Sequence, residues 1–159
     1  MSEKKVGIVM GSDSDFPVVR KAAEALKEFG ILFRSPKEVA EFAQNARANG
    51  FGVIIAAAGM AAHLAGAIAG NTTLPVIAIP VKAKALEGVD ALLSSVMMPP
   101  GVPVATVGID AAANAGYLAA EILAVSDDSI AEKLLAFKKK QNEKNLAADA
   151  KMQETAKEI

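Results

Sequence analysis

Short apolar runs alternate with amphipathic stretches along most of the chain. The runs have strand length, are bounded by turn residues, and fall at residues 5–10, 52–58, 74–80 and 102–108. The run GVIIAAA (52–58) has no polar position, which is typical of a strand that is covered on both faces. Strands that alternate with helices at this spacing predict βαβ crossovers, and therefore a parallel α/β sheet between two helical layers.

Amphipathic helices are predicted between and after these runs. The first extends from Pro17 to a stop at Gly30, and its core face consists of Val18, Val19, Ala22, Ala23, Leu26 and Phe29. Further helices are predicted at about 36–49, at 89–98, at 110–124 and at 129–158, with a short one after GMAAH (59–63). Within 89–98, the core face is expected to consist of Val89, Leu92, Leu93 and Val96.

Residues 29–39, FGILFRSPKEV, interrupt this alternation. A strand is expected between the first two helices, but very few residues separate Gly30 from Pro36. The ILFR stretch (31–34) leaves room for no more than a vestigial strand. The sequence therefore predicts that the second strand of the sheet is shortened or missing.

Composition limits the class of protein. The chain has 159 residues, enough for one domain with a sizeable core, and is 52% hydrophobic but only 4% aromatic. It has no cysteine, so disulfides and zinc–thiolate sites are excluded and a cytoplasmic location is the default expectation. A net charge of −1 gives no electrostatic reason to expect a nucleic acid or a membrane as partner, and no apolar run is long enough to span a bilayer.

The corner GSDSDFP (11–17) follows the first strand and opens the first helix. Ligands of parallel sheets bind where such corners meet helix N-termini, so backbone N–H groups and the hydroxyls of Ser12 and Ser14 are candidates for holding a phosphate. The alternative is that Ser14 or Asp15 only caps the helix. Neither glycine-rich nucleotide motif is present, and Asp13 with Asp15 makes a weak metal site because no further oxygen ligands stand nearby.

Other candidate residues also follow predicted strands. Arg34 precedes Ser-Pro at a strand-to-helix corner, where it could clamp a phosphate or simply be solvated. His63 is the single histidine, so a multi-histidine metal site is impossible; among small apolar residues it is more typical of a core or interface position than of a catalyst. Lys82 and Lys84 follow the third clear strand and would favour an anionic ligand, although solvated loop lysines are the simpler expectation.

Four stretches together carry a resemblance to a known family: VGIVMGSDSDFPVV, GMAAHLAG, TTLPVIAIPVKAKALEGVDALLS and MPPGVPVATVGIDAAANAGYLAAEIL. They resemble class I PurE, the N5-carboxyaminoimidazole ribonucleotide mutases of de novo purine biosynthesis, in order over roughly residues 6–124. The resemblance implies a flavodoxin-like three-layer α-β-α sandwich and a homo-octamer. It implies an isomerase that converts the ribonucleotide carbamate to 4-carboxy-5-aminoimidazole ribonucleotide through transient carbon dioxide, with no cofactor and no metal.

The resemblance also assigns residues of the site. Ser12 and Ser14 would contact the phosphate, Asp15 the ribose hydroxyls, and Arg34 would clamp the phosphate. The pocket would be lined by Gly11, Gly59 and His63. The domain is expected to cover residues 1–125, followed by a helix over 126–159 that packs on the domain or on a neighbouring subunit.

The chain departs from this family at several positions. In LFRSP, Phe33 stands where the family has a histidine that transfers the proton at the ring, and several residues are absent just before it. Ala57 replaces a usual glycine, and its methyl is expected to crowd backbone close to the ligand. These departures leave the catalytic residues unknown. They predict an impaired mutase or, as an alternative, a catalytically silent relative that binds a phosphoribosyl ligand or serves in oligomer assembly.

Overall fold

The computed structural model describes residues 4–31, 33–34 and 39–156, and only the backbone of residues 33 and 34. The strands are β1 (Lys5–Met10), β2 (Phe33–Arg34), β3 (Phe51–Gly59), β4 (Val76–Val81) and β5 (Ala105–Thr106). The helices are α1 (Phe16–Glu28), α2 (Val39–Asn45), α3 (Leu64–Ala69), α4 (Val89–Val96), α5 (Ala112–Ala124) and α6 (Asp128–Ala156), with a 3₁₀ helix η1 (Asp13–Asp15) before α1.

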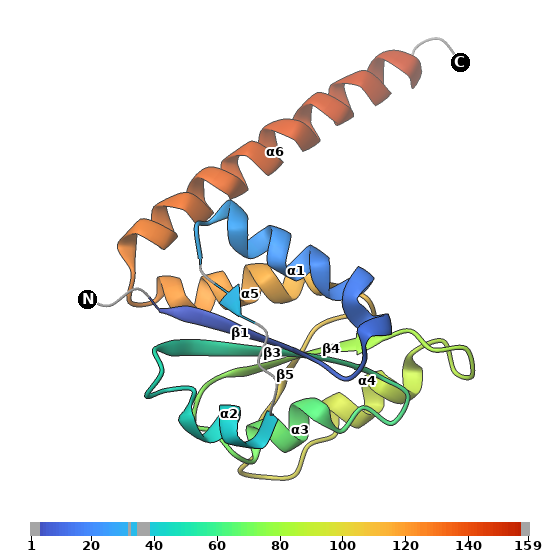
Figure 1. Cartoon of the computed structure of the whole chain (residues 1–159). Coiled ribbons are helices and arrows are strands. Elements are labelled where there is room, and N and C mark those ends of the chain that lie inside the picture. Colours follow the sequence, from blue (N-terminus) through green and yellow to red (C-terminus); the bar gives the residue numbers. More distant parts are fainter. Residues whose placement is uncertain (1–3, 32, 35–38, 157–159) are drawn as a thin grey trace.

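The strands form one parallel sheet in the order β2-β1-β3-β4-β5. Helices α1 and α5 cover one face, and α2, α3 and α4 cover the other (Figure 1). This is the three-layer sandwich with a parallel sheet that the alternating pattern predicts, and the prediction is confirmed.

Strand β3 shows why its sequence has no polar position. Val53, Ile55 and Ala57 lie in the core cluster under α1 and α5, whereas Ile54 and Ala56 lie in the cluster under α2 and α3. All five side chains are at most 1% exposed. A strand that is buried on both faces requires apolar residues at every position, not at alternate ones.

Helices α1 and α5 are packed closely because their contact residues are small. A Cβ atom on Gly116 would lie 2.7 Å from the Ala25 Cβ and 2.8 Å from the carbonyl oxygen of Ala22. The larger side chains of this layer lie at its end, where the Phe29 ring meets the rings of Tyr117 and Phe137 edge-on, with centroids 5.9 and 5.8 Å away. This aromatic cluster joins the start of α6 to the domain.

Strand β2 has two residues, so the prediction of a shortened second strand is confirmed. It pairs with β1 at Val6 and Gly7, whereas β1 continues to Met10. With a rise of about 3.3 Å per residue, the last residue of β2, Arg34, lies about 10 Å before the carboxyl end of β1.

Two predicted elements are wrong in extent or orientation. The strand expected at 102–108 is reduced to Ala105–Thr106, consistent with Pro103, which has no N–H for a ladder. The core face expected for α4 is largely reversed: Val89, Leu93 and Val96 are 49%, 54% and 50% exposed, Leu92 is half-buried, and the buried residues are Ala91 and Ser95.

Two helices also differ from expectation at their ends. The second helix ends at Asn45, earlier than expected, and the start predicted for it at Pro36 lies outside the described residues. The predicted helix at 110–124 begins at Ala112.

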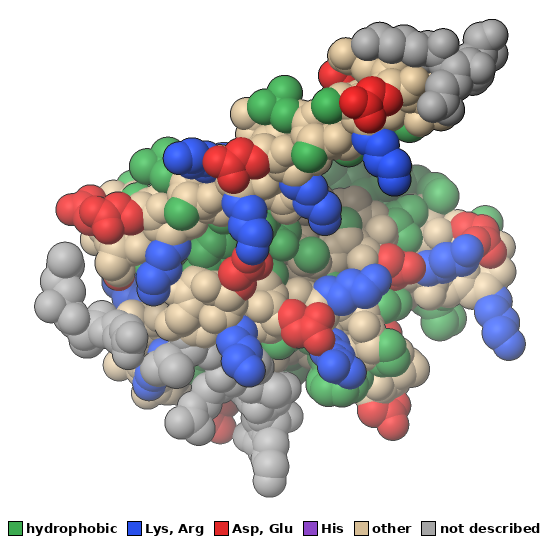
Figure 2. Space-filling view, turned by 90° about the horizontal axis from the view of Figure 1, so that it is seen from above, with side chains coloured by type: hydrophobic (Ala, Val, Ile, Leu, Met, Phe, Trp, Pro, Cys, Tyr) green, Lys and Arg blue, Asp and Glu red, His purple; other side chains and the backbone are tan. Residues whose placement is uncertain are grey.

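Helix α6 begins on the domain and then extends away from it (Figure 1). Ile130 and Leu134 are buried in its first turns, whereas Leu146 is 61% exposed. Side chains of both charge signs are interspersed over this part of the molecule (Figure 2), including an ion pair of 3.1 Å between Lys138 and Glu121 of α5. Within the described ranges, none of the helices combines the length and the apolar character needed to cross a membrane.

Candidate functional site

The loops that follow β1, β3, β4 and β5 are joined at the carboxyl edge of the sheet. The Gly11 N–H donates to the carbonyl of Ala57 at 3.0 Å, which ties the corner after β1 to β3. Farther along, the Asp110 N–H donates to the carbonyl of Pro80 at 2.9 Å, which ties the segment after β5 to β4. Most of the candidate residues named from the sequence therefore lie along one edge, as expected for a parallel sheet.

The corner after β1 is a capped helix start. The Ser12 N–H donates to Oδ2 of Asp15 at 3.1 Å, and the Ser14 N–H donates to Oγ of Ser12 at 3.2 Å. The Asp15 N–H donates to the carbonyl of Ser12 at 3.1 Å. Side chain and backbone thus satisfy each other in a capping box, and Pro17 follows in the first turn of α1, where its missing N–H costs nothing.

Asp15 is the buried member of this corner. It is 7% exposed, and burial raises the pKa of its carboxyl group above 3.8, although hydrogen bonds from the backbone of Ser12 and Gly11 oppose that shift. Asp15 precedes α1 without a side-chain hydrogen bond that caps it, so the alternative that Ser14 or Asp15 caps this helix is wrong. Ser12 caps η1, and Oδ2 of Asp15 accepts from the Ser12 N–H as the second half of that capping box. A contact with ribose hydroxyls stays a prediction.

The two serine hydroxyls face outward. Ser12 and Ser14 are exposed, the Ser14 hydroxyl donates to the Ser12 Oγ at 3.0 Å, and the Ser12 hydroxyl donates to Oδ1 of Asp13 at 3.0 Å. The amides of Ser12 and Ser14, in contrast, are already bonded within the corner. An incoming anion would accordingly meet hydroxyl groups first, at the positive end of α1.

His63 lies in the loop after β3, just before α3. It is exposed, so the expectation of a core position is wrong for the single chain. Its Nδ1 lies 2.5 Å from the carbonyl oxygen of Ala61. A carbonyl oxygen can only accept, so Nδ1 is the donor of this hydrogen bond. Met60, at the start of this loop, has a positive φ of 56°, which is uncommon for a residue with a side chain.

Gly59 ends β3 under close contact from β4. A Cβ atom here would lie 3.2 Å from the carbonyl oxygen of Val81 and 3.9 Å from the Cβ of Ala83. Gly11 is more open, since its Cβ would meet Oδ2 of Asp15 at 3.4 Å. Both glycines lie at the carboxyl edge of the sheet.

Ala57 does not act as expected from the sequence. Its side chain is fully buried in the core cluster under α1 and α5, and only its carbonyl faces the corner, where it accepts from Gly11. The extra methyl therefore fills the core and does not crowd a ligand.

The remaining charged candidates differ in what surrounds them. The backbone of Arg34 lies beside Gly7, and its side chain is outside the described part of the chain. Lys82 is exposed and forms an ion pair with Glu87, which is the main reason that its pKa is raised. In the described ranges, no group of three or more histidine, cysteine, aspartate or glutamate side chains could hold a metal ion.

Asp110 also lies at the carboxyl edge of the sheet, although it is not among the candidate residues named from the sequence. The pattern predicts it as the first residue of the helix at 110–124, but it precedes α5 with a φ of 56°, and its Oδ1 accepts from the Lys82 N–H at 2.9 Å. The only local signal is its residue type, because aspartate and asparagine tolerate the left-handed region better than other side chains.

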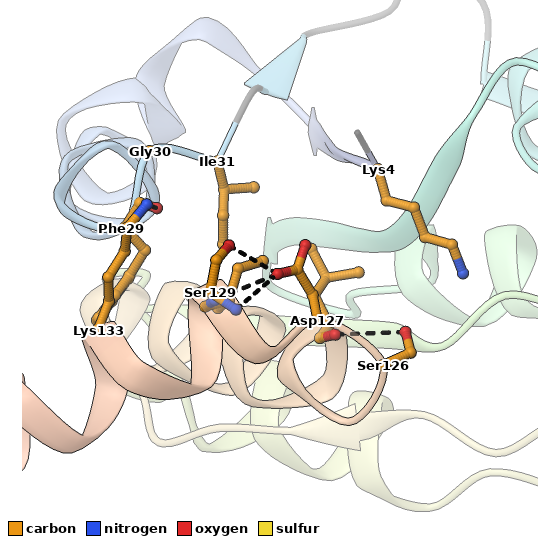
Figure 3. Close-up of a pocket in the computed structure, with 10 residues that line it drawn as sticks. Lys4, Phe29, Gly30, Ile31, Ser126, Asp127, Ser129 and Lys133 are labelled. Carbon is orange, nitrogen blue, oxygen red and sulfur yellow. Dashed lines mark hydrogen bonds between the residues drawn. The ribbon is translucent and has the colours of Figure 1, made fainter. Parts of the chain in front are cut away.

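A cavity of about 150 Å³ lies at the opposite, amino-terminal edge of the sheet (Figure 3). Two of its polar side chains are bonded within the chain: Lys133 Nζ donates to the carbonyl of Phe29 at 2.9 Å, and Oδ1 of Asp127 accepts from Ser129 and Ile130. The Lys133 ammonium lies at the C-terminal end of α1 and the Asp127 carboxylate lies at the N-terminal end of α6. The helix dipole favours a positive charge at the first position and a negative charge at the second. This cavity is a joint between helices and lies away from the candidate site.

Comparison with known proteins gives a consistent result. The AIR carboxylase family model matches residues 5–144. A relative from Methanocaldococcus jannaschii is 52% identical over 94% of this chain and 98% of its own length, and one from Pyrococcus abyssi is 51% identical over 84% and 82%. A third, from Vibrio parahaemolyticus, is 48% identical over 90% and 95%. Each of these is named N5-carboxyaminoimidazole ribonucleotide mutase.

A solved structure agrees with the observed fold. The crystal structure of Treponema denticola PurE superimposes with a TM-score of 0.84 at 29% identity and covers 93% of this chain and 98% of that one. The flavodoxin-like arrangement inferred from the sequence is thereby confirmed.

Substitution of Asp15 tests whether its charge is needed for capping. Folding raises the pKa of Asp15, so the folded state favours the protonated carboxyl group. The contribution of this group to the free energy of unfolding is therefore complete below about pH 3.8 and is lost as the pH rises through the higher folded-state pKa. Asp15→Asn keeps an acceptor for the Ser12 amide without the buried charge. We therefore expect its free energy of unfolding at neutral pH to equal or exceed that of the wild type.

Asp15→Ala removes the acceptor, and we expect it to lose about 0.5–2 kcal/mol. Urea titrations of the three proteins between pH 3 and pH 7 measure both effects. If the asparagine variant is as unstable as the alanine variant at pH 7, the capping interaction depends on the carboxylate charge and the analysis of burial is wrong.

Proposed function

The chain belongs to the AIR carboxylase family, and we propose that it interconverts N5-carboxyaminoimidazole ribonucleotide and 4-carboxy-5-aminoimidazole ribonucleotide in purine biosynthesis. One observation carries the proposal: a hydroxyl-lined helix start at the carboxyl edge of a parallel sheet, in a chain about half identical to named mutases over nearly its whole length. The substrate is a small ribonucleotide, and the proposed reaction needs neither cofactor nor metal.

The corner after β1 would bind the phosphoribosyl part of this substrate. The Ser12 and Ser14 hydroxyls are exposed beside the N-terminus of α1, where the helix dipole favours an anion. Asp15 would accept from the ribose hydroxyls, and Arg34 would supply a guanidinium for the phosphate from the end of β2. Gly11, Gly59 and His63 would line the pocket along the same edge.

The proton transfer of this reaction has no evident carrier in β2. When the carbamate loses carbon dioxide, its nitrogen gains a proton, and when the ring carbon takes up carbon dioxide, that carbon loses one. In PurE-like proteins the residue at the Phe33 position is a histidine, and a phenyl ring cannot exchange protons. The alignment with the Methanocaldococcus relative spans 158 residues yet covers only 94% of this 159-residue chain, so the relative has residues without a counterpart here. We therefore propose that turnover is slow.

Binding tests the assignment of Arg34. Charge-assisted hydrogen bonds contribute about 1.5–3 kcal/mol, so Arg34→Ala should raise the Kd for the ribonucleotide by about tenfold or more. The matched control is Arg20→Ala on α1, an exposed arginine paired with Glu24 at 2.8 Å, which should leave the Kd unchanged. Isothermal titration calorimetry measures both. If both substitutions change the Kd equally, Arg34 does not contact the ligand.

Restoration of the missing segment tests the proton-transfer argument. We expect a chain in which residues 31–38 are replaced by a full second strand that carries a histidine at the Phe33 position, as in PurE-like proteins, to turn over about 10²–10⁴ times faster, the usual contribution of a general acid–base. The control carries the same segment with alanine in place of its histidine. Equal rates for the original and restored chains would show that proton transfer does not depend on this segment. Binding without turnover in every form would favour the silent, oligomer-forming alternative.

The exposed apolar face of α4 supports a proposal of self-assembly. Val89, Leu93 and Val96 recur at spacings of four and three residues, so they form one exposed apolar stripe, which Met97 extends with 77% exposure. We propose that this stripe packs against further copies of the chain in a homo-octamer, and that the outer part of α6 packs on a neighbouring subunit.

Native mass spectrometry tests this assembly. We expect Leu93→Lys to shift the protein to smaller species, because a charge would be buried in the apolar contact. Val125→Lys is the matched control, since Val125 is 89% exposed between α5 and α6, away from the stripe. A wild-type monomer, or an unchanged mass for Leu93→Lys, contradicts the proposal.

A further inference from the structure

The loop between β4 and α4, residues 82–88, is closed by the segment that follows β5. The Lys82 N–H donates to Oδ1 of Asp110 at 2.9 Å, and the Asp110 N–H donates to the carbonyl of Pro80 at 2.9 Å. Asp110 therefore bonds to the chain on both sides of Val81, the last residue of β4. These two hydrogen bonds fix the direction in which the loop leaves the sheet.

The last residue of the loop, Gly88, lies beside its first residue, Lys82. Gly88 is buried, and a Cβ atom on it would lie 2.7 Å from Cγ2 of Ile109 and 3.2 Å from Cα of Lys82. Its φ of 92° also favours glycine. The two ends of the loop thus meet each other and the Ile109–Asp110 pair.

Contacts within the loop make it compact. The Glu87 N–H donates to the carbonyl of Ala83 at 3.1 Å, and the Val89 N–H donates to that of Leu86 at 2.9 Å. The Lys82 and Glu87 side chains form an ion pair across it. The loop is a small closed unit held at its base.

Asp110 meets two requirements that few residues meet together. Its backbone is left-handed, with a φ of 56°, which aspartate and asparagine tolerate and most other side chains do not. Its carboxylate provides the acceptor for the Lys82 amide. Alanine would fail both requirements, glycine would meet the first, and asparagine would meet both.

The loop base adjoins the candidate site. Val81 pairs with Gly59 in the sheet, and Ala83 lies over Gly59, where a Cβ atom would be 3.9 Å from the Ala83 Cβ. The loop that carries His63 begins at the next residue, Met60. A displacement of the loop base would therefore move the residues that flank the candidate site at the ends of β3 and β4.

From this geometry we propose that Asp110 is a positioning residue for ribonucleotide binding. Its hydrogen bond to the Lys82 amide holds residues 82–88 as a preformed wall beside Gly59, so that the substrate does not have to order the loop when it binds. The inference rests on the proposed function, because the ligand is the ribonucleotide. Its hydrogen-bonding part can be tested without any ligand.

Hydrogen exchange followed by mass spectrometry tests the hydrogen bond first. In Asp110→Ala, amides of peptides covering residues 82–89 should exchange about tenfold faster or more, since an interaction with a charged acceptor is lost. Asp110→Asn should restore the wild-type rate, and Asp110→Gly, which relieves only the backbone, should not. Asp127→Ala is the control: Asp127 caps α6 at the opposite edge, so its loss should speed exchange there and leave 82–89 unchanged.

Calorimetry with the ribonucleotide then tests the positioning role. Asp110→Ala and Asp110→Gly should raise the Kd about tenfold, Asp110→Asn should bind as the wild type does, and ligand should slow exchange of 82–89 in the wild type. Unchanged exchange in Asp110→Ala, no rescue by asparagine, or a loosened loop with an unchanged Kd would each overturn the inference. If the wild type does not bind the ribonucleotide, the proposed function and the positioning role both fail, and exchange alone still decides whether Asp110 holds the loop.

Discussion

Parallel pairing of β1, β3 and β4 determines where the chemistry of this chain can occur. The central residues of these strands are buried on both faces by helices, so a ligand can be reached only from the strand ends and the loops that follow them. The pairing brings their carboxyl ends to one edge, where Gly11 bonds to Ala57 and Asp110 bonds to Pro80. Loops that are far apart in sequence are thereby held within hydrogen-bonding distance, and the helix dipole of α1 points at the same edge.

The same topology makes the core of the fold independent of strand β2. In the order β2-β1-β3-β4-β5, the second strand lies at an edge, so shortening it to two residues removes ladder hydrogen bonds without dividing the core. The aromatic contacts of Phe29 and the close approach at Gly116 lie in other layers and do not depend on β2. A chain of this topology can therefore keep the whole sandwich with only two residues in β2.

Features that depend on residues close together in the sequence could be predicted, whereas features that depend on distant residues or on another chain could not. The buried run at 52–58 and the stripe of α1 are local patterns that one hydrophobic core explains, and both agree with the structure. The stripe of α4 has the same periodicity but faces outward, because periodicity shows that a face is apolar and not which chain covers it. Asp110 has only its residue type as a local signal, since its partner Lys82 is 28 residues away.

The corner after β1 was predicted in position but not in its internal bonding. Capping and ligand binding are alternatives in the sequence of this corner, yet in the structure different atoms are available for each. The amides of Ser12, Ser14 and Asp15 and the buried Oδ2 are used within the corner, whereas the two hydroxyls face solvent. A hydroxyl can rotate to donate to a phosphate while its oxygen still accepts from a backbone amide. The cap can therefore stay intact when an anion binds, and the rigidity that it gives to the corner lowers the cost of ordering the site.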